Sequence, residues 1–128
     1  GVTIADTTRA QRVLETSHPP TYYIPREDIL LEYLTQTPHL SYCEFKGEAS
    51  YWNVRVNGKS ALDCAWSYES PVKGYEVLKG HLAFYASHMD ACYVDDERVQ
   101  AQPGNFYGGW ITSDIVGPFK GSTGSWGW

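Results

Sequence analysis

The dipeptide Asn57-Gly58 constrains the fold of this chain more than any other feature. It separates two runs, 49–56 and 59–68, that are rich in residues favouring β-strands. Asn-Gly readily adopts the positive φ angles of a type I′ turn, so the two runs are predicted to form a hairpin with a two-residue loop.

A loop of two residues also fixes which residues face one another across the hairpin. Pairing that starts at the turn and continues without interruption places Tyr51 opposite Cys64 and, farther out, Lys46 opposite Glu69. Because side chains alternate along a strand, Glu48 is then expected on the same face as Lys46 and Glu69.

Length and composition limit the classes of protein to which the chain can belong. Its 128 residues predict a single domain, 1–128, and 42% hydrophobic against 20% charged residues argue against disorder. The net charge of −5 argues against nucleic acid as a partner, because such binders cluster Lys and Arg. No apolar run approaches the roughly 18 residues of a membrane helix, so no membrane partner is predicted.

The remaining strand and turn signals predict a mainly β fold of two sheets. The other predicted elements are a strand over 21–24, one or two short helices over 25–28 and 70–78, and a second hairpin formed by 82–85 and 91–94. The Gly- and Trp-rich tail, 103–128, is expected to pack against the domain, or to serve a protein partner or self-association.

Three cysteines, Cys43, Cys64 and Cys92, form no CxxC pair. An odd count without such pairs is typical of reduced thiols in a cytoplasmic protein and predicts no metal site. Since the sequence begins at Gly1 without a Met, further residues are expected upstream.

Several side chains are candidates for chemistry, each with a plainer alternative. Lys46 would favour the thiolate of Cys43 and make it a nucleophile, or Cys43 is simply a buried thiol. Lys46, Glu48 and Glu69 could handle an anionic ligand as an acid–base set, or form an exposed ion pair worth about 0–1 kcal/mol.

Other candidates would complete a pocket around that set. His18 stands before Pro19-Pro20, where it could transfer protons or merely close a turn. Arg9 and Arg26 are candidate clamps for an anion, with surface placement as the alternative. The candidate walls are aromatic residues that could equally belong to the core: Tyr23, Tyr51, Trp66 and Tyr68.

The run Tyr-Cys-Glu-Phe-Lys-Gly-Glu-Ala-Ser-Tyr-Trp at 42–52 resembles the domain-of-unknown-function 427 family. The segments 15–20, 22–28 and 65–68 resemble it as well, so the resemblance covers nearly the whole chain. This chain carries Glu44 where the family usually has Pro after the Cys. The resemblance implies a compact, mainly β fold of two packed sheets, similar to methionine sulfoxide reductase B and the glutathione-dependent formaldehyde-activating enzymes. Those folds often hold zinc through paired CxxC motifs, which this chain lacks, so a zinc-free fold is expected.

Some collections label that family as nucleotidyltransferases. The chain has no Gly-rich P-loop, and its acidic run Asp95-Asp96-Glu97 could bind magnesium but is more typical of a solvated edge. We therefore expect a small-molecule binding domain or enzyme for an anionic ligand. The alternatives are a protein-interaction module that uses the Trp-rich tail and a nucleotidyltransferase-like enzyme; no cofactor is indicated.

Overall fold

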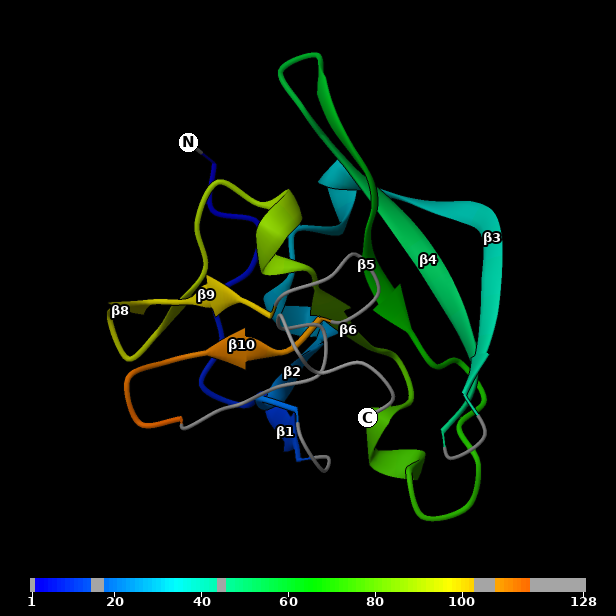
Figure 1. Ribbon diagram of the computed structural model, residues 1–128. Helices are drawn as coiled ribbons and strands as arrows, with labels where there is room; N and C mark the ends of the chain where they lie inside the picture. The colour runs from blue at the N-terminus through cyan, green and yellow to red at the C-terminus, as the bar shows by residue number, and fades with distance from the viewer. Residues whose placement is uncertain (1, 15–17, 44–45, 103–107, 116–128) are drawn as a thin grey trace, which may run out of the picture.

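The computed structural model describes residues 2–14, 18–43, 46–102 and 108–115, and these form a mainly β domain (Figure 1). Six antiparallel strands make one sheet in the order β1-β2-β6-β5-β4-β3. Their bounds are β1 (Gln11–Val13), β2 (Thr21–Pro25), β3 (Leu34–Cys43), β4 (Gly47–Val56), β5 (Lys59–Ser67) and β6 (His81–Phe84).

Two small hairpins accompany the sheet. One pairs β7 (Tyr93–Val94) with β8 (Glu97–Arg98), and the other pairs β9 (Gln100–Ala101) with β10 (Trp110–Ile111). The mainly β class is therefore confirmed, but one large sheet with two hairpins replaces the two packed sheets that were predicted. The predicted hairpin of 82–85 with 91–94 is wrong, because β6 pairs with β2 and β5 inside the large sheet.

The predicted helices occur only as single 3₁₀ turns, and the described residues contain no α-helix. The four turns are η1 (Arg26–Asp28), η2 (Leu31–Tyr33), η3 (Glu76–Leu78) and η4 (Ala86–His88). Pro25 precedes η1 with a φ of −58°, the angle to which its ring restricts it. Gly80 adopts a φ of +74° shortly after η3. The turn η1 thus lies within the predicted helix 25–28, whereas only the last three residues of the predicted helix 70–78 are helical.

The β4–β5 hairpin projects from the domain and turns at Asn57-Gly58, as predicted (Figure 1). Val56 pairs with Lys59 and Val54 with Ala61, which confirms the register near the turn. Beyond these pairs the register shifts, so that Tyr51 pairs with Trp66 and not with Cys64. The extra residues lie in β5, where Asp63 has a φ of +49°.

Successive side chains of β2, β4 and β6 point to opposite faces of the sheet, so the buried side chains form two clusters. The first consists of Ile24, Ile29, Val54, Cys64, Ala65, Leu82, Phe84, Val99 and Trp110. The second, here called the aromatic face, consists of Tyr23, Ala49, Tyr51, Trp66, Tyr68, Leu78 and Ala83. Neighbours in sequence, such as Tyr23 and Ile24, belong to different clusters, as expected where a sheet is covered on both faces.

The tail enters the domain as predicted where the structure describes it. Trp110 is buried, and its indole N–H donates to the carbonyl of Phe84 at 2.9 Å. Gly108 lies so close to Trp66 that an added Cβ would stand 2.2 Å from the indole ring, so a glycine is required there. Trp126 and Trp128 lie outside the described residues. No helix in the described ranges has the length and apolar character needed to cross a membrane.

Leu82→Ala tests the packing of the first cluster. Leu82 is fully buried, so the variant should lose about 2–5 kcal/mol of unfolding free energy in urea denaturation, through lost contacts and a cavity. Leu62→Ala is the matched control, because Leu62 is 66% exposed and should change stability by less than about 0.5 kcal/mol. Equal losses in the two variants would contradict this core assignment.

Candidate functional site

An irregularity in β5 places Asp63 beside the aromatic face. Between the pairs Val54–Ala61 and Trp52–Ala65, the residues 62–64 of β5 oppose only Asn53 of β4. Asn53 stabilises this bulge, because its side-chain oxygen accepts a hydrogen bond from the Asp63 N–H at 2.8 Å. The left-handed backbone at Asp63 is uncommon outside glycine, although Asp tolerates it better than most residues.

A second irregularity, in β3, brings two side chains toward Asp63. The register with β4 shifts between Gln36 and Leu40, and the Thr37 hydroxyl accepts from the His39 N–H at 3.1 Å. The same hydroxyl donates to Asp63 Oδ1 at 3.1 Å, and His39 Nδ1 lies 3.9 Å from Asp63 Oδ2. A carboxylate and an imidazole thus meet across β4, with side chains that are 43% and 53% exposed.

Two hydroxyl groups, those of Ser41 and Tyr51, lie next to the pair formed by His39 and Asp63. Tyr51 is buried, and its hydroxyl lies 2.7 Å from the Ser41 hydroxyl. The His39 ring stands edge-on to the Tyr51 ring, with centroids 4.4 Å apart. Burial, together with a hydrogen bond to Tyr51, raises the pKa of Tyr85, so this phenol stays protonated at neutral pH.

Aromatic rings form the floor beneath these groups. The Trp66 indole N–H donates to the Tyr23 hydroxyl at 3.3 Å, and the two rings meet edge to face. The ring centroids of Tyr85 and Trp66 are 4.5 Å apart, and those of Tyr68 and Tyr23 are 6.2 Å apart. These edge-to-face and tilted contacts pack the rings of the aromatic face against one another.

We call Thr37, His39, Ser41 and Asp63 the polar rim of the aromatic face. Its carboxylate accepts hydrogen bonds, its imidazole can accept or donate, and its hydroxyls do both. At 3.9 Å, the contact between His39 and Asp63 is longer than a hydrogen bond, so it is a loose charge contact. The rim and the buried rings together supply residue types that are common in small-molecule sites.

Five of the sequence-predicted residues gather at this face. Tyr23, Tyr51, Trp66 and Tyr68 belong to its cluster, and Cys43 packs against that cluster. Lys46, only 5% exposed, donates from Nζ to Cys43 Sγ at 3.9 Å, as the predicted thiol–ammonium pair requires.

The predicted pairing of Lys46 with Glu69 is wrong. The β4–β5 ladder ends at Ser50–Ser67, and the Lys46 carbonyl instead accepts from the N–H of Val72, three residues beyond Glu69. Glu48 is exposed on β4, whereas Lys46 is buried, so the two do not share an environment. The register shift in β5 and the positive φ of Gly47, +113°, account for the difference.

Arg26 and Glu69 form an ion pair away from the polar rim. Arg26 Nη2 lies 2.6 and 2.7 Å from the two carboxylate oxygens of Glu69. The guanidinium also stacks over Trp52 at 5.1 Å from the ring centroid, while its buried Nε has no hydrogen-bond partner in the described structure. Trp52 packs against the first cluster, so Arg26 does not face the aromatic one.

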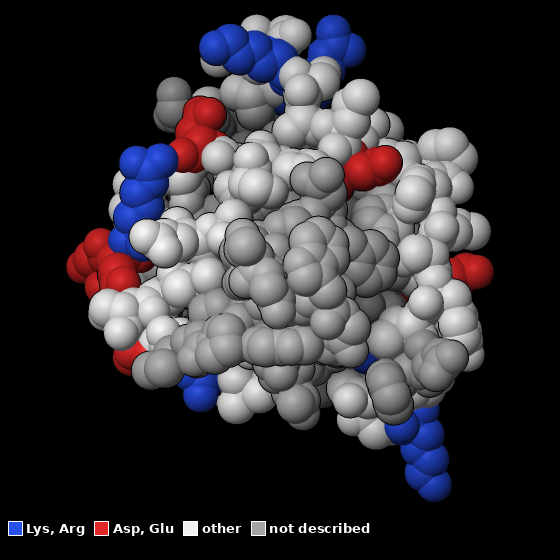
Figure 2. All heavy atoms as spheres, in the orientation of Figure 1, with Lys and Arg blue, Asp and Glu red and all other residues white. Residues whose placement is uncertain are grey.

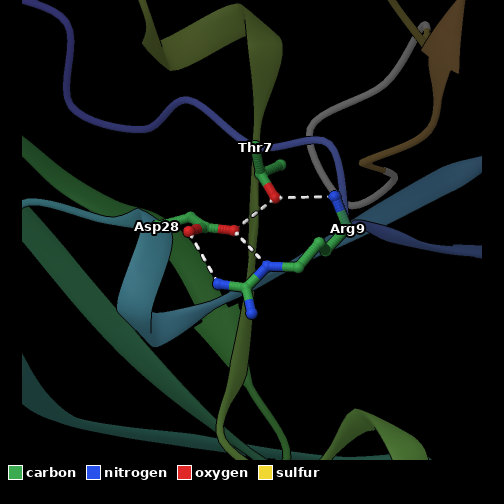
Figure 3. Close-up of polar contacts among 3 residues, drawn as sticks. All are labelled: Thr7, Arg9 and Asp28. Atoms are coloured by element: carbon green, nitrogen blue, oxygen red, sulfur yellow. Dashed lines mark hydrogen bonds and ion pairs between the residues drawn. The ribbon is translucent and has the colours of Figure 1, made fainter.

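Arg9 likewise binds a carboxylate of this chain (Figure 3). Its Nη2 and Nε donate to the two oxygens of Asp28 at 2.8 and 3.2 Å, and the Thr7 hydroxyl donates to the same carboxylate at 2.6 Å. The bonds from Arg9 and Thr7 lower the pKa of Asp28, and the pairing with Asp28 raises the pKa of Arg9.

His18 takes part in a loop-closing contact, the plainer of its two predicted roles. Its Nδ1 lies 3.0 Å from Nε2 of the buried Gln102. Gln102 Oε1 accepts from the Gly109 N–H at 3.1 Å, which fixes the amide orientation and makes Nε2 the donor to His18. His18 therefore links the loop before β2 to the segment before β10.

Five residues of this face were not predicted as site residues from the sequence: Thr37, His39, Ser41, Asp63 and Tyr85. Pro38 was the available signal, because a proline inside a strand marks an edge or a bulge and so points to Thr37 and His39. Asp63 gave no comparable signal.

The charged groups do not form a metal site in the part of the chain described. No group of three or more His, Cys, Asp or Glu side chains there could hold a metal ion. On the face in Figure 2, charges of both signs are dispersed around the undescribed grey residues.

A family model described as a domain of unknown function (DUF427) matches residues 1–95. No curated protein matches the chain.

Arg9→Gln should raise the pKa of Asp28 toward the ordinary Asp value, which NMR titration of the side-chain carboxyl would measure. Because the folded pKa is lowered, the pair stabilises the fold above the unfolded pKa, and this stability is lost as pH falls through the folded value. The stability difference between wild type and variant should therefore be present at pH 7 and shrink in acid. The exposed Arg55→Gln is the control, and an unchanged Asp28 pKa in Arg9→Gln would contradict the assignment.

Alkylation should distinguish the three free thiols. Burial raises the pKa of Cys64 and of Cys92 to about 11, so few thiolates form at pH 8 and iodoacetamide should modify both slowly. Cys43 and Cys92 are both partly exposed, but the raised pKa of Cys92 slows its reaction, so Cys43 should be modified first, as mass spectrometry of digested protein would show. All three should react alike in urea; modification of Cys64 as fast as Cys43 in folded protein would be inconsistent with the structure.

Proposed function

The chain belongs to the DUF427 family, a domain of unknown function, and from that premise we propose that it binds a small planar molecule at its aromatic face. One observation carries the proposal. His39 Nδ1 and the Thr37 hydroxyl both lie beside the Asp63 carboxylate, at 3.9 and 3.1 Å. The His39 ring contacts the ring of Tyr51, whose hydroxyl lies beside that of Ser41.

The floor favours a ring as the ligand. Tyr51 and Trp66 are each less than one-tenth exposed, and their rings are already held by hydrogen bonds and edge contacts. A flat ligand at the polar rim therefore reaches only the edges of these rings, and its main ring contact is with the exposed imidazole of His39, which stands edge-on to Tyr51.

The rim favours a ligand that donates hydrogen bonds. Asp63 accepts one hydrogen bond, from Thr37, and Oδ2 lies at a loose 3.9 Å from His39. A carboxylate accepts several hydrogen bonds, so a ligand N–H or O–H can approach Asp63 while both protein contacts persist.

The charges around the face argue against the anionic ligand expected from the sequence. Arg9 and Arg26 are engaged by Asp28 and Glu69, and the rim itself carries the negative Asp63. A neutral or weakly basic ring suits these groups better, because an anion near an exposed carboxylate is repelled. The interaction module and the nucleotidyltransferase stay predictions from sequence.

The test is a thermal-shift screen of planar heterocycles and phenols, followed by titration of the hits. Hits should raise Tm, because ligand binding stabilises the folded state. Asp63→Asn should weaken a hit by about tenfold or more, through loss of a charge-assisted hydrogen bond. Tyr51→Phe, which keeps the ring, should weaken it less.

Asp96→Asn is a closely matched control. Asp96 is exposed and, like Asp63, adopts a positive φ, +69° against +49°, so both substitutions place Asn in a backbone conformation that it tolerates. The proposal would be overturned if no compound raised Tm, or if Asp63→Asn and Asp96→Asn bound the hits equally.

A further inference from the structure

A cavity of about 350 Å³ borders the first cluster and shares no residue with the polar rim. Segments far apart in the sequence form this cavity. Its lining consists of Arg12 from β1, Tyr22 from β2, Val94, Asp95 and Glu97 from the β7–β8 hairpin, and a turn that follows β10. Its volume is within the range of about 300–1,000 Å³ that is usual for small-molecule sites.

Hydrogen bonds hold the walls of this cavity together. Glu97 accepts from the Ser113 N–H at 2.6 Å and from the Ser113 hydroxyl at 2.9 Å, which ties the β7–β8 hairpin to the turn. Asp114 accepts from the Thr112 hydroxyl, and this bond, the Asp114 backbone and the charge of Arg12 lower its pKa. Glu97 and Asp114 are therefore structural supports as well as sources of negative charge.

Two charged side chains of opposite sign in the lining make no side-chain hydrogen bond among the described residues. Arg12 is exposed, its charge acts on Asp114, and it makes no hydrogen bond among the described residues. Asp95 stands at the β7–β8 turn with a φ of +49° and likewise has no hydrogen-bond partner among them. Arg12 can therefore donate hydrogen bonds to a carboxylate of a ligand, and Asp95 can accept a hydrogen bond from an ammonium group.

An apolar surface lies beside these charges. Tyr22 is fixed against Trp110, with ring centroids 5.4 Å apart, and both Tyr22 and Val94 pack against the first cluster. The lining as a whole carries three carboxylates and one guanidinium, so an acidic ligand side chain would be repelled.

We propose that this cavity binds a free α-amino acid with an uncharged side chain. Arg12 receives the carboxylate, Asp95 the ammonium group, and Tyr22 with Val94 the side chain. The proposal is independent of binding at the aromatic face, because the two sites have no residue in common.

The experiment uses leucine, 3-methylbutylamine, which lacks the carboxylate, and 4-methylpentanoate, which lacks the ammonium group. Calorimetric titration of the full chain should find leucine bound at least about tenfold more tightly than either analogue, because only leucine makes both charge contacts. Arg12→Gln should lower leucine affinity to that of the amine, and Asp95→Asn to that of the acid. Glutamate should bind more weakly than leucine.

Matched controls separate lost contacts from lost folding. Arg98→Gln removes an exposed Arg on β8 that does not line the cavity, and Asp96→Asn alters the neighbouring turn residue; both should bind leucine like wild type. Circular dichroism should be unchanged in all four variants, and leucine should shift the NMR signals of Tyr22. Leucine binding no tighter than its analogues, or equal loss in Arg12→Gln and Arg98→Gln, would overturn the proposal.

Discussion

The bulge opposite Asn53 is the local constraint on which the candidate site depends. It places three residues of β5 against one of β4, and the hydrogen bond from the Asp63 N–H to Asn53 satisfies a backbone donor that leaves the ladder. The cost is a left-handed backbone at a residue that is not glycine. The result is a carboxylate that reaches Thr37 and His39 of β3 across β4.

The same bulge explains why the aromatic face was predictable and its detailed pairing was not. The turn at Asn57-Gly58 is local chemistry, and it fixed the pairs nearest to it. The bulge then shifts the register by two residues, an even number, so Tyr51 and Trp66 still share a face although their partners changed. Cys64 lies inside the bulge, and its side chain belongs to the first cluster, not to the aromatic face.

The polar rim could not have been predicted, because it requires two irregularities at the same level of the sheet. The shift in β3 around Pro38 and the bulge in β5 flank β4 on its two sides, and only together do they bring His39 to Asp63. The spacing of the histidines in the sequence does not indicate the contact between His39 and Asp63. Similarly, the positive φ of Gly47 redirects the chain before β4, which placed Lys46 beside Cys43 and Val72 in place of Glu69.

The distribution of charge connects the two proposed sites. In a chain with a net charge of −5, Arg9 and Arg26 are already bound to carboxylates of their own domain, and Lys46 is buried. An ion pair within the fold offsets the charge of the cation and reduces what it can offer to an incoming anion. The charged groups that line the polar rim and the cavity are mostly carboxylates. Both surfaces should select ligands by the hydrogen bonds that those ligands donate, with Arg12 as the exception that admits a carboxylate.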